Sequence, residues 1–403
     1  MENNKIRVAI THGDTNGIGY ELIFKTFADT EMLELCTPII YGSPKVAAYH
    51  RKALNIEANF TIINSAEEAH DGRVNIIPCF DEEIKIDFGI PTQESGTAAL
   101  KALDRAMTDY REGLYDVLVT APLDSNNIQG QGFRFPGHHQ YIETSLGEGK
   151  KALVVLCNER LRIAVATNET LSLKDVPAAI TKEGIETKAT QFFQTLKSDF
   201  NISNPRVAIL ALNPGQPGKE EKEILQPAVE ELFDKGIAAF GPYPADDFFG
   251  KGYYNDFDGI LAMYHDQGVA PFKAISPEPC VKFAAGLPVI ATAPDNNAGF
   301  DIAGQCVANE DSFRNAIYAA IDIFRCRENY EAPYANPLPK LYHEKREDGE
   351  KVRFNIPKKR EGNGDKKEGH GPKTFGPHTT DNKEEHKQTQ NVTSENTTEN
   401  SEA

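Results

Sequence analysis

Residues 7–27 read RVAITHGDTNGIGYELIFKTF, and this stretch decides the fold class. An apolar run from Arg7 to Thr11 enters a glycine-rich turn, and an amphipathic stretch follows from Tyr20 to Phe27. An apolar run of this kind is typical of a strand buried on both faces, and the amphipathic stretch is typical of a helix. Strand, turn and helix in this order form the repeating unit of α/β proteins.

The same alternation continues along the chain as far as Arg327. Further strands are predicted at residues 38–41, 74–78, 117–120, 152–157, 163–167, 206–211, 259–262 and 289–292. Further helices are predicted at residues 96–112, 181–198, 224–235 and 310–327. Apolar strands separated by helices predict parallel strands covered on both faces. We therefore expect an α/β fold, and the length suggests two lobes with a cleft between them.

Composition and charge exclude several classes of protein. The 403 residues carry a net charge of −17, which repels phosphate backbones and argues against general nucleic-acid binding. No apolar run approaches the roughly 20 residues that span a bilayer, and the polar start does not resemble a signal peptide. Six cysteines without paired spacing suit reduced thiols, so we expect a cytoplasmic protein without a membrane anchor.

The end of the chain has a different composition. Residues 344–403 are rich in Lys, Glu, Gly, Asn, Thr and His, and their apolar residues are isolated. Such a segment cannot bury enough apolar surface to offset the entropy lost on ordering. We expect a disordered C-terminal tail.

The glycine-rich turn has two interpretations. Its amide groups could bind a phosphate at the start of the following helix. The spacing differs from the Gly-x-Gly-x-x-Gly fingerprint of dinucleotide sites, however, and a tight turn in which Gly supplies a positive φ is the alternative.

Two adjacent histidines, His138 and His139, follow a Pro-Gly break. Neighbouring side chains point in different directions, which argues against one metal ion shared by both. Either imidazole could donate to a phosphate or carry a proton, and an exposed loop is the alternative.

Two further groups of polar residues follow predicted strands. His265 and Asp266 come directly after residues 259–262, where catalytic groups of α/β proteins gather, and they could form a metal site or a tuned base. Lys273, in the same predicted loop, could hold an anionic group, and an ordinary polar loop is the alternative. Asp246 and Asp247 lie in a Pro-rich turn, where a helix N-cap is favoured over a cation site.

Taken in order, six motifs between Ile6 and Tyr330 resemble the PdxA family, the 4-hydroxythreonine-4-phosphate dehydrogenases of vitamin B6 biosynthesis. The motifs are THGD with GIG (11–14 and 17–19), PGH (136–138), LNP (212–214), GPYPAD (241–246), MYHDQG (263–268) and GLP (286–288). The resemblance implies a fold like the isocitrate and isopropylmalate dehydrogenases, with two α/β/α lobes. Residues 1–130 and 285–335 would form the first lobe, and residues 131–284 the second lobe, with the metal and substrate cleft.

The resemblance also implies an activity. It is the NAD-dependent oxidation of the secondary alcohol of 4-phosphohydroxy-L-threonine. The resulting β-keto acid then loses carbon dioxide to give 3-amino-2-oxopropyl phosphate. A divalent metal (Mg, Mn or Zn) would polarise the oxygen as a Lewis acid. The implied assembly is a homodimer in which both subunits supply metal ligands.

The implied metal and catalytic residues are only partly present. His265 matches the third of three metal-binding histidines, Glu169 stands nearest the first, and Gly215 occupies the place of the second. The metal site is therefore degraded, and one imidazole with carboxylates favours Mg or Mn over Zn. Lys273 and Asp246 are the implied catalytic residues.

The implied substrate and cofactor contacts have also changed. His138 and Lys273 are retained. His139 stands where the family has a threonine, and Lys282 stands where it has an asparagine. Asn296 replaces a histidine of the nucleotide-side loop. Ala291 and Ser125 stand where the family has an arginine and a lysine.

These replacements leave three hypotheses open. The chain is the family dehydrogenase, a dehydrogenase of another phosphorylated hydroxy acid such as a threonate or erythronate phosphate, or a catalytically silent paralogue that binds a ligand or a partner enzyme.

Overall fold

A computed structural model describes residues 5–129, 135, 137–168, 170–215, 218–276 and 278–335. They belong to one compact unit, Met1–Leu338. The tail predicted at residues 344–403 lies outside the described residues. Among the described helices, none is long and apolar enough to cross a membrane.

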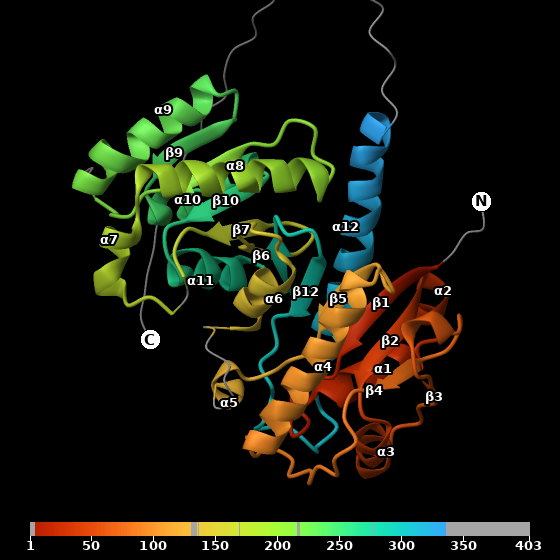
Figure 1. The fold of residues 1–403 in the computed structure, drawn as a ribbon. Helices are drawn as coiled ribbons and strands as arrows, with labels where there is room; N and C mark the ends of the chain where they lie inside the picture. Colours follow the sequence, from red (N-terminus) through yellow and green to blue (C-terminus); the bar gives the residue numbers. More distant parts are fainter. Residues whose placement is uncertain are drawn as a thin grey trace, which may run out of the picture. The chain divides into compact units, whose positions relative to one another are not determined.

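One sheet runs through the described part of the chain (Figure 1). Its strands, in chain order, are β1 (Ile6–Thr11), β2 (Cys36–Gly42), β3 (Thr61–Ile62), β4 (Asn75–Pro78), β5 (Val117–Thr120), β6 (Leu153–Cys157), β7 (Arg162–Val165), β8 (Val207–Leu210), β9 (Ala239–Tyr243), β10 (Gly259–Ala262), β11 (Val281–Ala285) and β12 (Ile290–Pro294). Their order in the sheet is β3-β4-β2-β1-β5-β12-β11-β6-β7-β10-β8-β9. Strands from residues 1–130 and 285–335 thus occupy one half, and we propose that the two halves are the two lobes.

The prediction of parallel strands is wrong in the middle of the sheet. β11 pairs antiparallel with β12 and β6, and β6 pairs antiparallel with β7. For β6 with β7 and for β11 with β12, the reason is the length of the connections, because a short turn can join only antiparallel neighbours. The predicted GLP motif lies in one such turn, where Gly286 has a φ of +82°.

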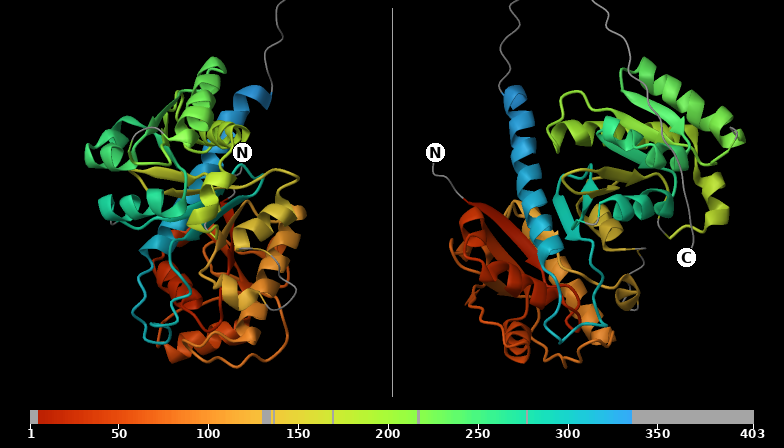
Figure 2. Two further views of the ribbon diagram at one scale, coloured as in Figure 1. Left: turned by 90° about the vertical axis from the view of Figure 1, so that its left-hand side faces the viewer. Right: turned by 180° about the vertical axis from the view of Figure 1, so that it is seen from behind.

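Helices cover both faces of the sheet (Figure 2). They are α1 (Gly19–Ala28), α2 (Met32–Leu35), α3 (Pro44–Ala53), α4 (Gln93–Arg111), α5 (Ser125–Ile128), α6 (His138–Leu146), α7 (Val176–Ala179), α8 (Lys182–Ser198), α9 (Gln226–Asp234), α10 (Ala245–Gly250), α11 (His265–Ile275) and α12 (Asp311–Ala335). Short 3₁₀ turns lie at Ala66–Glu68, Leu173–Asp175 and Tyr253–Asp256, and a π-helical turn at Glu221–Leu225 precedes α9.

Alternation along the strands explains the layers. Val8 and Ile10 of β1 pack in one core with α1, α8, α9 and α12, whereas Ala9 packs in a second core with α4 and α6. Successive strand residues point to opposite faces, so a fully apolar strand needs helices on both. A third core joins the far end of the sheet to α10 and α11 through Phe248 and Phe272.

Two predicted loops are helical. His138 and His139 begin α6, and Lys273 lies in the last turn of α11. Each helix follows one residue with extended backbone, Gly137 or Tyr264, and is held by apolar residues at helical spacing, such as Ile142 and Leu146 in α6.

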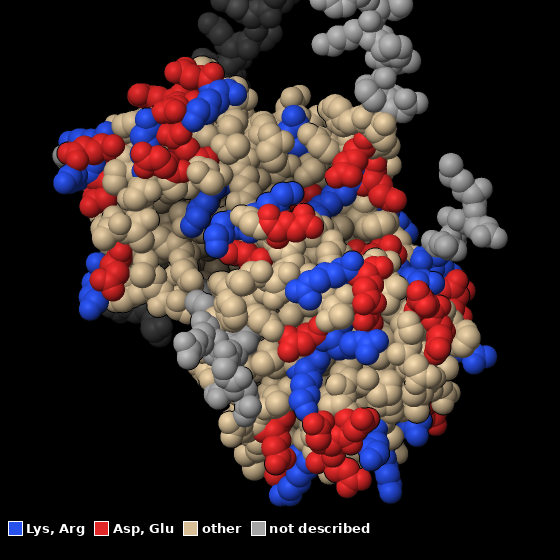
Figure 3. Space-filling model, viewed as in Figure 1, with Lys and Arg blue, Asp and Glu red and all other residues tan. Residues whose placement is uncertain are grey.

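The surface carries both signs of charge despite the net negative total. On the face shown in Figure 3, basic and acidic side chains are interspersed. Helices α8 and α9 give an example, since Lys182 and Lys235 both bind Glu186 and Glu231. Exposed pairs like these contribute little each, and as a network they link the two helices.

Candidate active site

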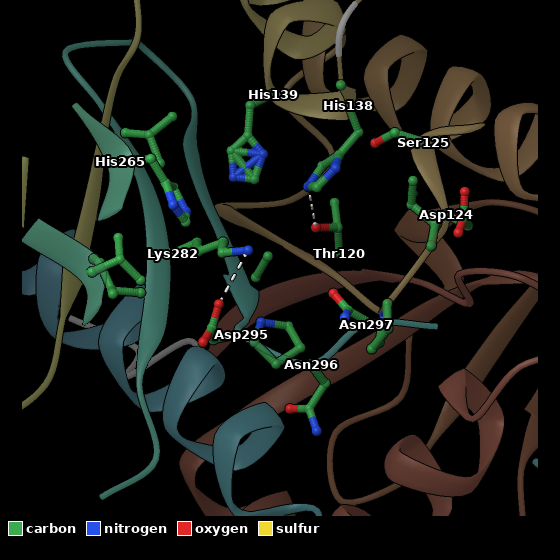
Figure 4. Close-up of a pocket in the computed structure, with 18 of the residues that line it drawn as sticks. Thr120, Asp124, Ser125, His138, His139, His265, Lys282, Asp295, Asn296 and Asn297 are labelled. Carbon is green, nitrogen blue, oxygen red and sulfur yellow. Dashed lines mark hydrogen bonds and ion pairs between the residues drawn. The ribbon is translucent and has the colours of Figure 1, made fainter. Parts of the chain in front are cut away.

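A cavity of about 1100 Å³ opens at the carboxyl end of β5 and beside β11 and β12. Its walls come from residues 120–126, the start of α6, helix α11, and residues 293–301 after β12. It contains six of the predicted site residues: His138, His139, His265, Lys273, Lys282 and Asn296. Figure 4 shows how most of these side chains line it.

Two imidazoles form one wall of the cavity. The ring centroids of His138 and His139 are 4.0 Å apart, and His138 Nε2 lies 3.4 Å from Thr120 Oγ1. Burial lowers the pKa of His139 to about 4, and the charge of Lys282 adds to the effect. Burial, His139 and Lys282 lower the pKa of His138 well below its usual range. Both rings are therefore neutral near pH 7 and can accept a hydrogen bond or a proton.

Lys282 and Asp295 lie below these rings in Figure 4, and Lys273 also binds this carboxylate. Asp295 Oδ2 is 2.5 Å from Lys273 Nζ, and Asp295 Oδ1 is 3.1 Å from Lys282 Nζ. Burial acts to raise the pKa of Asp295, but the hydrogen bond from Lys273 and the charge of Lys282 outweigh it, so this pKa is lowered. The hydrogen bond with Asp295 raises the pKa of Lys273. The group carries a net charge of about +1, which suits an anionic ligand.

His265 is the first residue of α11, and in Figure 4 His139 lies between it and His138. Its Nδ1 is 2.8 Å from Asp266 Oδ1. Gln267 fixes the start of this helix, because its side chain accepts from Met263 N at 2.7 Å and donates to Ala211 O at 2.6 Å. The ends of β10 and β8 are thereby tied together.

The described residues of one chain do not fit a metal ion. Over the described residues, no three His, Cys, Asp or Glu side chains lie close enough together to hold one. Glu169, which stands nearest the first histidine of the family pattern, lies outside the described residues. Gly215, where the family pattern has a histidine, is surrounded by open space, so nothing steric excludes a side chain there.

Asp246 is not among the residues that line the cavity. It is exposed in the first turn of α10, next to Asp247, which binds Lys251 at 2.8 Å. The predicted N-cap is wrong in position, because Pro244 is the N-cap and neither carboxylate caps the helix.

In the glycine-rich turn after β1, backbone amides already donate hydrogen bonds within the protein. The amides of Asp14, Gly17 and Ile18 donate to Pro122 O, Asp14 O and Ala298 O at 3.0–3.1 Å. Gly13 has a φ of +73°, and a Cβ on it would lie 2.2 Å from Pro122 O. The structure thus supports the tight-turn interpretation, because these amides are not free to bind a phosphate.

A buried carboxylate organises this turn. Asp14 accepts from Asn16 N at 2.9 Å, Ser95 Oγ at 3.1 Å and Asn127 Nδ2 at 2.6 Å. Ser95 lies in α4 and Asn127 in α5, which begins beside the cavity. The turn therefore supports one wall of the cavity from outside.

Asn296 offers a feature that suits a cofactor. Among the described residues its buried Oδ1 has no hydrogen-bond partner, although it belongs to the cavity wall. A buried acceptor without a donor is costly, and a ligand that donates a hydrogen bond would satisfy it.

Asp295 and Lys188 are among the cavity residues that were not predicted. Asp295 follows β12 directly, so the rule that sites form at strand ends could have found it. Lys188 lies in the middle of α8, donates to Ala166 O, and has a pKa lowered by burial. No sequence signal separated it from the other lysines of that helix.

Comparison with known proteins identifies the family. The family model "Pyridoxal phosphate biosynthetic protein PdxA" matches residues 34–320. The chain belongs to this family. The membership predicted from the motifs is therefore confirmed.

Similar proteins agree with this assignment. A 4-hydroxythreonine-4-phosphate dehydrogenase of Bacteroides thetaiotaomicron is 54% identical over 88% of this chain and 98% of its own. The crystal structure of a 4-hydroxythreonine-4-phosphate dehydrogenase from Klebsiella pneumoniae matches with a TM-score of 0.70 and 28% identity, over 80% of this chain and 99% of that one. A protein of Oceanobacillus iheyensis, 32% identical over 78% of this chain and 97% of its own, has a name that includes the words "D-threonate 4-phosphate dehydrogenase". The predicted α/β fold class is confirmed with the family.

Proposed function

We propose that this chain catalyses the reaction named for its relatives, the oxidation of 4-phosphohydroxy-L-threonine, with NAD as the oxidant and loss of carbon dioxide. The observation that carries the proposal is the cavity itself. It combines two lysines for an anionic substrate, two neutral imidazoles for a hydroxyl proton, and a buried acceptor at Asn296. The proposed product is 3-amino-2-oxopropyl phosphate, a step toward pyridoxal phosphate.

Each group in the cavity has a role in this proposal. Lys273 and Lys282 bind an anionic group of the substrate through charge-assisted hydrogen bonds. The neutral ring of His138 or His139 accepts a hydrogen bond from the secondary alcohol at a ring nitrogen. Asn296 Oδ1 accepts a hydrogen bond from NAD, which, when bound, supplies the hydride acceptor.

The metal stays an expectation of the family resemblance. Because the described residues of one chain do not fit a metal ion, no step is derived through one. We propose that the protein is a cytoplasmic homodimer, as the resemblance implies, in which His265 and Asp246 would lie near residues of the partner subunit. Sedimentation equilibrium at micromolar concentration should return about twice the chain mass.

The test is NADH formation by the purified full chain with 4-phosphohydroxy-L-threonine, with and without Mg, Mn or Zn. Unphosphorylated 4-hydroxythreonine is the matched control, and we expect it to react at least about tenfold less efficiently because it lacks the phosphate group. A silent paralogue would form no NADH with either compound.

D-threonate 4-phosphate is the second candidate substrate, favoured by the name of the Oceanobacillus relative. It presents the same phosphate and hydroxyl groups to the cavity but lacks the amino group. The ratio of kcat/KM for the two phosphorylated substrates decides between them.

A further inference from the structure

We propose that Asp295 is an internal counter-ion, which occupies Lys273 and Lys282 in the free protein and competes with the anionic group of the substrate for them. The inference rests on the proposed function only for the identity of that anionic group. It adds a residue that sets how tightly the cavity holds anions.

The geometry places one carboxylate against two ammonium groups. Each oxygen of Asp295 has its own lysine, Oδ2 at 2.5 Å and Oδ1 at 3.1 Å. Cys280 Sγ is also 3.4 Å from Oδ2, and its burial raises the thiol pKa to about 12, so it is a neutral donor. The carboxylate side chain is only 10% exposed, whereas the lysine side chains are 53% and 33% exposed. A ligand in the cavity can therefore reach the two lysines, whereas the carboxylate of Asp295 stays largely buried behind them.

Among the described residues, Asp295 is the carboxylate that forms ion pairs with these two lysines. His138 and His139 of α6 face Lys282, and the pKa of each is lowered by burial, so both are neutral near pH 7. The local charge is therefore set by two ammonium groups and one carboxylate. Without Asp295 it would be about +2, and the attraction for an anion would increase.

Lys282 supplies the second cation of this group, since its Nζ lies 3.1 Å from Asp295 Oδ1. An extra lysine alone would bind phosphate more tightly and slow its release. Asp295 offsets this effect, since it supplies an opposite charge within hydrogen-bonding distance of both ammonium groups.

The test is Asp295→Asn, which removes the charge and keeps the shape. Calorimetry measures the Kd of two simple probes, inorganic phosphate and glycolate, which separate a phosphate subsite from a carboxylate subsite. We expect the Kd of at least one probe to fall about tenfold, because a like charge near the anion is removed. In turnover, KM and kcat should both fall, since substrate binds more tightly and product leaves more slowly.

Two controls separate this role from a structural one. Asp295→Glu keeps the charge and should bind the probes with an affinity close to that of the wild type. Glu82→Gln removes one carboxylate from an exposed pair with Lys101, outside the cavity lining, and should change neither Kd. A merely structural role would weaken binding in Asp295→Asn, since a disturbed cavity binds less.

Several outcomes would overturn the proposal. The first is that Asp295→Asn binds both probes with an affinity equal to or weaker than that of the wild type. The second is that neither the wild type nor the variant binds phosphate or glycolate. Because the calorimetry needs no turnover, a wild type that binds phosphate but forms no NADH would reject the proposed function and leave the counter-ion intact.

Discussion

Two polar clusters lie at carboxyl ends of strands in this protein, and only one of them is a candidate site. In the cluster around Asp14, after β1, Asp14, Asn16 and Ser95 are buried, and the carboxylate accepts three hydrogen bonds from the protein. The cluster around Asp295, after β12, opens into the cavity, where Lys273 is 53% exposed. Polar residues at a strand end therefore indicate a site only when some of their hydrogen-bonding groups remain free for a ligand.

The largest effect on stability is expected from Asp14→Ala. Three donors, Asn16 N, Ser95 Oγ and Asn127 Nδ2, would lose their acceptor inside the protein. We expect a loss of about 3 kcal/mol in the free energy of unfolding, measured by urea denaturation. Asp247→Ala, which breaks an exposed pair with Lys251, is the control and should cost less than about 0.5 kcal/mol. Equal losses of unfolding free energy in the two variants would mean that the hydrogen bonds of the buried Asp14 stabilise the protein no more than an exposed ion pair does.

Acid should destabilise the closed region through two buried histidines. Burial lowers the pKa of His12 to about 3 and of His50 to about 4, from 6.5 when unfolded. The unfolded chain therefore binds protons that the folded chain does not, and stability falls as the pH drops from about 6.5 toward about 4. Each group contributes up to about 1.4 kcal/mol per pH unit.

The variant His50→Gln tests this pH dependence. Glutamine cannot titrate, and its amide can still donate to Thr15 O, which His50 Nε2 contacts at 2.8 Å. Urea unfolding from about pH 7 to about pH 5 should show a shallower slope for the variant, by up to about 1.4 kcal/mol per unit. Parallel curves for the two proteins would mean that His50 is protonated in the folded state.

The smallest effect on stability is expected in the open cavity, for His139→Thr. The half-buried ring lies beside His138 and Lys282, and its loss should change the free energy of unfolding by less than about 0.5 kcal/mol. KM for the phosphorylated substrate should rise about fivefold, which corresponds to one lost hydrogen bond. A large loss of stability with an unchanged KM would instead assign His139 to the fold.

The sequence predicts the long, regular elements well. The strand Arg7 to Thr11 and the helix from Tyr20 to Phe27 appear as β1 and α1 with ends shifted by one residue. The strands β3, β9 and β11 were missed. β3 has only two residues, and β9 contains Gly241 and Pro242, which interrupt its apolar pattern. β11 is interrupted by Lys282, which reaches into the cavity.

The site could be predicted in part for a similar reason. Motifs identified His138, His265 and Lys273 as cavity residues. The two histidines are the first residues of α6 and α11, and Lys273 lies about two turns further along α11. The partnership of Asp295 with two lysines could not be predicted, since the three residues belong to α11, β11 and the loop after β12. Which lysine meets which carboxylate depends on the antiparallel hairpin in the middle of the sheet, and the pattern of apolar runs did not reveal that hairpin.

The most direct test of the central claim, that the open cavity is the active site, is the kcat/KM of Lys273→Met for 4-phosphohydroxy-L-threonine and NAD, measured with its unfolding midpoint. The account predicts a decrease of about 100-fold in kcat/KM, the loss of a charge-assisted contact to substrate. The midpoint should be nearly unchanged, because the Lys273 side chain is 53% exposed. A variant as active as the wild type would contradict the assignment of this cavity.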